Sequence, residues 1–242
     1  MPTLVLTPRF TEDSQALWRS AIQLGWQVER LKTWRIPERL KTVSDPVLYV
    51  EALFGPTLAE QLGIVLSEPP NGWLASLPNA YKKRQVSLMS MGEARQLTEP
   101  AFIKPPNDKS FPAKVYVGSQ LSEDYDDHLP VLVAEIVSWE KEFRCFVLER
   151  EPQAISVYLR GKTLQRDSGF NASESELCAA EEMVKSVLAD ATVNIPKAAV
   201  LDVGVITHRG WAVVEMNSVW GAGIYGCDPK KVLAVLKHSM VP

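Results

Sequence analysis

Apolar and polar positions switch between two periods in the first seventy residues. Leu17, Ala21 and Leu24 recur at helical spacing, and the helix they predict begins at Thr11, a plausible N-cap, and ends at Gly25. Short apolar runs predict four strands, at 3–7, 26–31, 47–52 and 64–66, with a shorter helix between the last two. Such alternation of strands and helices predicts a small parallel sheet with helices packed on it.

The remainder of the chain is richer in strands. A connection rich in Pro, Asn and Gly, with a short helix, is expected at 69–78. Apolar runs predict strands at 101–104, 113–117, 131–137, 142–148 and 154–159. Helical spacing predicts three further helices, at 81–97, 173–190 and 228–238. The fold class expected is therefore α+β, with an α/β N-terminal part.

The last third of the chain predicts a β-hairpin that carries acids. Two apolar runs, 201–205 and 211–217, flank a turn signal, and a carboxylate inside such a strand is costly unless it is paired or bound to a metal. Glu215 and Asn217 point to one face because side chains two apart on a strand do so. If the hairpin places Asp202 beside them, the oxygen-only cluster suits Mg²⁺. The alternative, a solvated polar face, is equally compatible with this spacing.

Composition narrows the classes of function. The 242 residues carry a net charge of −3, which argues against a nucleic-acid binder driven by phosphate contacts. No apolar run approaches the ~20 residues of a membrane span, and no basic segment leads into one at the N-terminus, so no membrane association is expected. The three widely spaced cysteines contain no CxxC motif and suggest free thiols in a reducing cytoplasm.

A lysine at the end of a buried strand is a candidate phosphate ligand. Lys104 is followed by Pro105 and Pro106, which fix the direction in which the chain leaves the strand. Such a lysine can reach a phosphate as a point charge, or it can simply extend to solvent. The polar segment 107–112 could close over phosphates, although it contains no glycine and is not a P-loop.

The segment 131–147 runs from an apolar strand through a short polar link into another strand. Exposed backbone at such a link can hydrogen-bond an adenine edge, and an acidic side chain there can hold ribose hydroxyls. Glu142 and Arg144 project from one face of the second strand, which would let Arg144 reach phosphate oxygens. The alternative is an exposed Glu142–Arg144 pair worth less than about 1 kcal/mol.

In this order, the motifs resemble the ATP-grasp superfamily of carboxylate–amine ligases. The resemblance covers roughly 81–242 and rests on Ile-Lys-Pro at 103–105, Ala-Glu-Ile-Val at 134–137, the strand at 142–147, Leu-Asp-Val-Gly at 201–204 and Val-Glu-Met-Asn at 214–217. Trp220 to Tyr225 is similar to small bacterial and phage-type members. The resemblance implies a βα domain at 1–78 before the ATP-grasp domain at 79–242. Two lobes of that domain, about 79–137 and 138–242, would hold ATP between them.

The resemblance also implies a role for each motif residue. Adenine would be held by Glu135, Ile136 and Val137, and ribose by Glu142 or Glu140. Phosphates would be contacted by Lys104 and by a second cation, either Lys83 or Arg84. Arg144 would lie near the γ-phosphate or an acyl phosphate, with Lys104 as its catalytic companion. Mg²⁺ would be held by Asp202, Glu215 and Asn217.

The activity implied is an ATP- and Mg²⁺-dependent ligase that activates a carboxylate as an acyl phosphate for attack by an amine. The alternatives are an ATP-grasp kinase without ligation and a non-catalytic ATP-binding protein. Small-molecule or peptide carboxylates and amines are the expected partners, and a homodimer is possible. The Gly-poor loop 107–112 departs from the Gly-rich loop of many members, which leaves its closure open.

Overall fold

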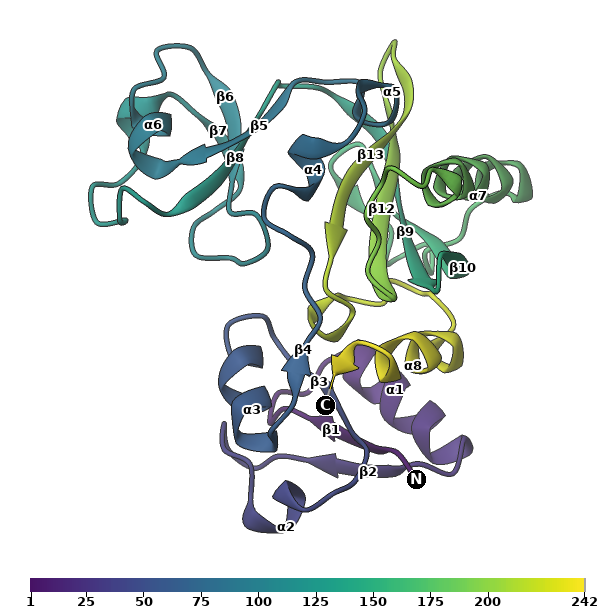
Figure 1. Ribbon diagram of the computed structural model, residues 1–242. Helices are drawn as coiled ribbons and strands as arrows, with labels where there is room; N and C mark the ends of the chain where they lie inside the picture. Colours follow the sequence, from purple (N-terminus) through teal and green to yellow (C-terminus); the bar gives the residue numbers. More distant parts are fainter. Residues whose placement is uncertain (242) are drawn as a thin grey trace.

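A three-stranded parallel sheet forms the N-terminal layer of the computed structural model, which describes residues 1–241 (Figure 1). β1 (Thr3–Leu6) lies in the middle and pairs with β2 (Gln27–Arg30) on one side and β3 (Pro46–Tyr49) on the other. All of β1 is buried, as expected for the central strand of a parallel sheet covered on its faces. The predicted parallel sheet is therefore confirmed for three strands.

The helices of this layer begin and end where the sequence signals indicate. α1 (Glu12–Gln23) starts after Thr11, whose hydroxyl accepts a hydrogen bond from the Ser14 amide at 3.0 Å. Gly25 follows its end with φ +75°, a conformation that side chains with a Cβ rarely adopt. Two further helices complete the layer, α2 (Glu38–Lys41) and α3 (Gly55–Leu62).

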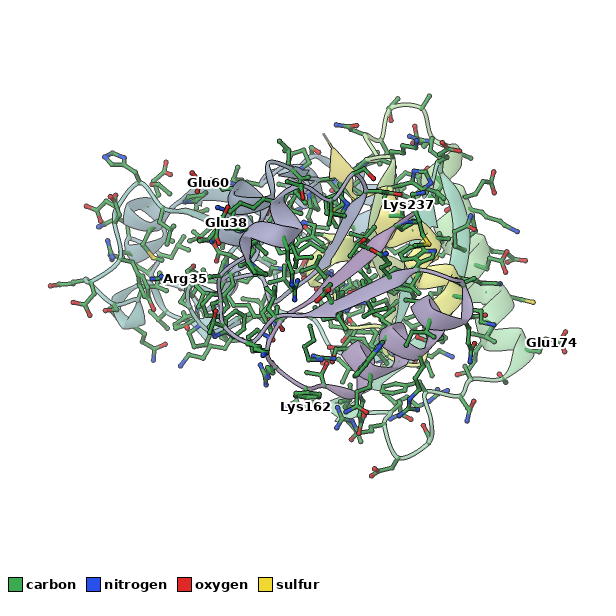
Figure 2. The ribbon with its side chains drawn as sticks, turned by 90° about the horizontal axis from the view of Figure 1, so that it is seen from below. Arg35, Glu38, Glu60, Lys162, Glu174 and Lys237 are labelled. Carbon is green, nitrogen blue, oxygen red and sulfur yellow. The ribbon has the colours of Figure 1, made fainter. Side chains whose placement is uncertain are left out.

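The fourth predicted strand is not part of the parallel sheet. β4 (Val65–Leu66) instead pairs antiparallel with β14 (Met240–Val241), because the end of the chain returns to the N-terminal layer and supplies its backbone partners. Lys237, which is labelled in Figure 2, adds an ion pair with Asp45 at 3.2 Å. Residues from the two ends of the sequence thus share one layer.

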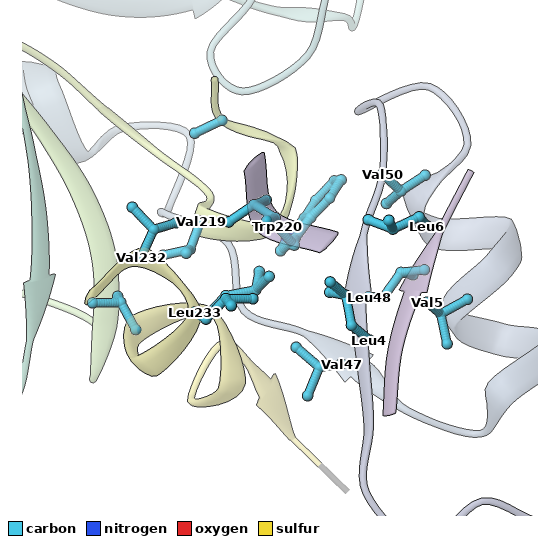
Figure 3. Packing of buried hydrophobic residues seen from close by; sticks show 14 of the residues in the cluster. Leu4, Val5, Leu6, Val47, Leu48, Val50, Val219, Trp220, Val232 and Leu233 are labelled. Carbon is cyan, nitrogen blue, oxygen red and sulfur yellow. The ribbon is translucent and has the colours of Figure 1, made fainter. Parts of the chain in front are cut away.

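The core of this layer also draws on the C-terminal part of the chain (Figure 3). Leu233 of α8 (Pro229–Lys237) is fully buried in the same cluster as Leu4 of β1. Trp220, in the short η2 (Val219–Gly221), joins this cluster and packs against Gly55 so closely that a Cβ there would overlap the indole ring. The N-terminal layer is therefore completed by residues far along the sequence.

A four-stranded antiparallel sheet forms the first lobe, in the order β5-β8-β6-β7. Its core contains Met91, Ile103 and Val131, all fully buried. The elements of this lobe are β5 (Val86–Ser90), α6 (Met91–Arg95), β6 (Ala101–Lys104), β7 (Lys114–Tyr116), η1 (Gly118–Gln120) and β8 (Pro130–Ala134).

The helix predicted over 81–97 is wrong. The segment instead forms α5 (Asn79–Lys82), β5 and α6, because Val86 to Ser90 pairs with β8 across the lobe. Ser90 then starts α6 as a capping box, in which its hydroxyl accepts from the Glu93 amide and the Glu93 carboxylate accepts from the Ser90 amide. Long-range strand pairing outweighed the local helical pattern here.

The second lobe is a five-stranded antiparallel sheet in the order β11-β10-β9-β12-β13, with α7 packed on it (Figure 1). Its elements are β9 (Trp139–Leu148), β10 (Glu151–Arg160), β11 (Thr163–Leu164), α7 (Glu174–Ala189), β12 (Ala198–Ile206) and β13 (Gly210–Asn217). α4 (Trp73–Ser76) and α5 lie against β13. Across residues 1–241, every helix is too short or too polar to span a membrane.

Candidate active site

Two adjoining cavities lie between the lobes. The first, about 350 Å³, is the hinge cavity; its walls are mainly apolar, and it reaches the link 135–137 and Glu142. The second, about 470 Å³, is the hairpin cavity, lined by Glu215 and Asn217 at the end of β13 and by the loop 105–113. Lys104 and Glu215 line both cavities, so the two form one continuous space.

The link after β8 offers backbone groups to the hinge cavity. Ile136 and Val137 line it, and within residues 1–241 neither the Glu135 carbonyl nor the Val137 amide has a backbone partner. The Glu135 carboxylate is engaged elsewhere, because it accepts two hydrogen bonds from Arg209, at 2.5 and 3.0 Å. That pairing lowers the pKa of Glu135 to about 2. Only the backbone of Glu135 is thus free to contact a ligand.

Of the two cations proposed ahead of the first lobe, the structure places Arg84 in the hinge cavity. Its guanidinium donates to the carbonyls of Lys82, Val213 and Val214 at 2.7–3.0 Å, and burial lowers its pKa to about 10. Lys83 lies outside the cavity lining, and its ammonium donates to the Arg209 carbonyl at 2.9 Å. Because the partners of Arg84 are neutral carbonyls, its charge remains available to an anion.

Glu142 lies at the wall of the hinge cavity and is buried. Burial raises the pKa of its carboxyl to about 7, although the Tyr158 hydroxyl donates to it at 2.7 Å and opposes this shift. Tyr158 itself lines the cavity. Nothing in the sequence singled out Tyr158, since its partner comes from the neighbouring strand.

The register of the hairpin brings its three predicted residues together. Asp202 on β12 pairs directly with Glu215 on β13, and the amide nitrogen of Asn217 donates to both carboxylates, at 3.1 and 2.9 Å. Lys104 forms an ion pair with Glu215, and despite burial it holds the pKa of Glu215 at about 2. The solvated-face alternative is therefore excluded, because Asp202 is completely buried.

Arg144 is buried beside Asp202 rather than at a cavity wall. Its guanidinium donates to both Asp202 oxygens, at 3.0 and 2.6 Å, and to the Gly223 carbonyl at 3.0 Å. Tyr158 and Tyr225, which stack on each other, both lie within 5.3 Å of it. Burial works to lower the pKa of Arg144, but Asp202 outweighs burial and raises it. The expected exposed Glu142–Arg144 pair is thus wrong, since both side chains are buried with other partners.

The donor set fits Mg²⁺ in part. Glu215 and Asn217 supply oxygen-bearing side chains at the wall of the hairpin cavity, which is the ligand chemistry that Mg²⁺ prefers. Asp202 lies behind them with both oxygens held by Arg144, so it reaches a metal only if Arg144 shifts. No cluster of three or more His, Cys, Asp or Glu suited to a metal is found among residues 1–241.

The loop 105–113 covers one side of the hairpin cavity, as its position in the sequence suggested. Asn107 connects it to the segment before α4, because its amide donates to the Pro69 carbonyl at 2.6 Å and to the Asn71 side chain at 2.9 Å. Phe111 anchors the other half in the core of the first lobe. The loop is thus held at both ends without any glycine.

Two sheets facing each other across such a continuous cavity, with a lysine and acids at its centre, define an ATP-grasp protein. The comparison with protein families identifies the branch: residues 81–235 match an ATP-grasp domain model, family 2 of its clade, and the chain belongs to this family. The fold class and the family resemblance are thereby confirmed. No curated protein matches the chain.

Solved structures agree on the fold. D-cycloserine synthetase DcsG is similar with a TM-score of 0.60 at 11% identity, over 98% of each chain. The D-alanine–D-alanine ligase from Bacillus anthracis, complexed with ATP, has a TM-score of 0.56 at 14% identity and covers 98% of this chain and 96% of its own. A RimK domain ATP-grasp protein from Sphaerobacter thermophilus DSM 20745 has a TM-score of 0.54 at 15% identity, over 96% of this chain and 100% of its own.

Proposed function

We propose that the protein is an ATP- and Mg²⁺-dependent ligase, which activates a carboxylate as an acyl phosphate for attack by an amine or a similar nucleophile. The observation that carries this proposal is the continuity of the two cavities through Lys104 and Glu215. An elongated ligand with an apolar base and a polyanionic tail matches an apolar hinge cavity that opens into a charged hairpin cavity. ATP has that distribution of polarity.

In the hinge cavity, adenine would lie against the apolar walls, with its edge on the Glu135 carbonyl and the Val137 amide. Glu142 would accept from the ribose hydroxyls, supported by Tyr158. Arg84 would contact the phosphates nearest the base, because its present partners leave its charge unpaired.

In the hairpin cavity, Lys104 would leave Glu215 and bind the phosphates as they enter, since a triphosphate is the stronger partner for an ammonium. Glu215 and Asn217 would then hold Mg²⁺, which supplies charge neutralisation for phosphoryl transfer. Arg144 would act indirectly, by fixing Asp202 and the turn at Gly223 behind the metal ligands.

The chemistry that this site would support has two steps. A carboxylate oxygen of the substrate attacks the γ-phosphorus, the bond to the β–γ bridging oxygen breaks, and ADP leaves with the electron pair. The amine then attacks the acyl carbon, loses a proton, and expels inorganic phosphate. The loop 105–113 would shield the acyl phosphate from water.

Two measurements test this proposal. A non-hydrolysable ATP analogue with Mg²⁺ should raise the melting temperature of the protein. A panel of carboxylates with ATP and hydroxylamine should then give ADP and a hydroxamate; a stable phosphorylated product would support the kinase alternative instead. Lys104→Met should reduce turnover by about 100-fold or more, as expected on removing a positioned charge. Lys162→Met, at an exposed turn of the second lobe labelled in Figure 2, is the matched control. Absence of any thermal shift would refute nucleotide binding.

A further inference from the structure

A third cavity, about 340 Å³, lies beside the hairpin cavity and is called here the N-terminal cavity. It lies where the carboxyl ends of β1 and β3 meet the first turn of α1 and the loop 221–225. Ligands of α/β sheets bind at this end of the strands. Lys109 and Gly221 line both this cavity and the hairpin cavity, so a molecule bound here would lie next to the phosphates of ATP.

Carboxylates form the enclosed part of this cavity. One oxygen of Glu51, Oε2, is buried and has no hydrogen-bond partner among residues 1–241, whereas Oε1 accepts from the Thr7 hydroxyl at 3.4 Å. Asp13 accepts from the Ile224 amide at 3.0 Å through Oδ2, and burial raises its pKa. A buried carboxylate oxygen without a partner costs free energy, so both groups would gain from a cation placed between them.

Cations form the rim of the same cavity. Arg9, Lys109 and Arg166 are exposed and line its entrance, with Arg166 3.6 Å from Glu12 of α1. Acid inside and base outside is the opposite of what a simple anionic substrate would require. It matches a molecule that carries a positive group at one end and a carboxylate at the other.

The size of the cavity limits what fits. A volume of 340 Å³ is at the lower end of the range of about 300–1,000 Å³ typical of small-ligand sites. Tyr49 and Tyr225 supply aromatic walls, and the Tyr49 hydroxyl is already satisfied by the Ala222 carbonyl at 3.0 Å. Those walls leave room for a short, uncharged side chain rather than for a folded partner.

We propose that the N-terminal cavity binds a free amino acid as a zwitterion, with its ammonium between Glu51 and Asp13 and its carboxylate at Lys109, facing the hairpin cavity. The proposal rests on the ligase function proposed above and specifies its acid substrate. N-acylation would remove the ammonium and leave the Glu51 oxygen unpaired, so the cavity discriminates against N-blocked acids.

The test compares each of the twenty common amino acids with its N-acetyl derivative. ADP release is measured at saturating ATP and Mg²⁺ for the wild-type protein. A subset of the free amino acids should be used, each at least about 30-fold better in kcat/KM than its N-acetyl form, the factor expected for losing a buried charged pair. No ADP release with any free amino acid, or equal use of the acetylated forms, would overturn the proposal.

Two variants connect this preference to the cavity. Glu51→Gln should lower kcat/KM for the free amino acid by about 30-fold or more, mainly through KM, while KM for ATP stays unchanged. Asp13→Asn, which still accepts from Ile224, should act in the same direction and serves if Glu51→Gln does not fold. Glu60→Gln, an exposed residue of α3 labelled in Figure 2, is the control of equal charge change. An unchanged preference in a folded Glu51→Gln protein would refute the assignment.

The amino-acid proposal and the ligase proposal fail differently. If the ATP analogue raises the melting temperature but no free amino acid is used, the amino-acid proposal fails and nucleotide binding stands. If the analogue gives no shift, the ligase proposal fails, and the amino-acid proposal fails with it.

Discussion

Replacing Glu142 by Gln should stabilise the nucleotide-free protein at alkaline pH and leave it unchanged in acid. Glu142 is buried at the wall of the hinge cavity, and burial raises its pKa from 4.5 to about 7. The folded protein therefore binds a proton at Glu142 more tightly than the unfolded chain does. Stability supported by this proton is fully present below pH 4.5 and is lost as the pH rises towards 7.

The magnitude follows from the size of the shift. Each pKa unit corresponds to about 1.4 kcal/mol, so the ionised carboxylate costs the folded state about 3 kcal/mol above pH 7. Gln has nearly the same shape, and its carbonyl oxygen can still accept from the Tyr158 hydroxyl. The variant removes the charge and keeps the hydrogen bond, so its advantage should approach that value.

The assay is chemical denaturation of both proteins without nucleotide, from pH 5 to 8.5. The difference in free energy of unfolding should be close to zero near pH 5 and should level off above pH 7. Glu140→Gln is the matched control, because Glu140 is exposed on the same strand and should change stability by less than about 0.5 kcal/mol. A difference that is independent of pH, or absent at pH 8, would refute the reasoning.

Three further substitutions test other parts of the site. Arg144→Ala should lower the free energy of unfolding by about 3–5 kcal/mol in urea titration, because it leaves Asp202 as a buried unpaired charge; a loss below about 1 kcal/mol would contradict this. Glu135→Ala should change the dissociation constant of the ATP analogue less than about threefold by calorimetry, since only its backbone faces the cavity and its exposed ion pair is worth under about 1 kcal/mol. Gly55→Ala should cost about 1–3 kcal/mol in thermal unfolding because Trp220 occupies the space of the new Cβ, and an unchanged melting temperature would refute that packing.

Local patterns predicted the elements whose partners are close in the sequence. The hairpin is an example, because its turn and its alternation set Asp202 opposite Glu215 without any distant contact. α7, too, begins and ends within a residue or two of its predicted bounds, since Ser173 provides a strong capping signal. In these cases short-range physics decides the outcome.

Features that depend on distant partners could not be predicted. The helical pattern at 86–90 yields to pairing with β8, more than forty residues away, and β4 finds β14 at the other end of the chain. The pairing of Arg144 with Asp202 follows from the register of β9 against β12, which alternation alone does not reveal. Glu51 and Asp13 carried no motif at all, because only the folded chain places them around one cavity.

The packing of α8 against the N-terminal sheet has a consequence for the order in which the protein matures. During synthesis, β1, β3 and α1 leave the ribosome first, but the helix that buries their shared core emerges last. Until then Leu4 and its neighbours lack the cover that Leu233 provides. The first segment translated is thus among the last to reach its final packing, and a nascent chain stopped before α8 would present exposed apolar surface to chaperones and proteases.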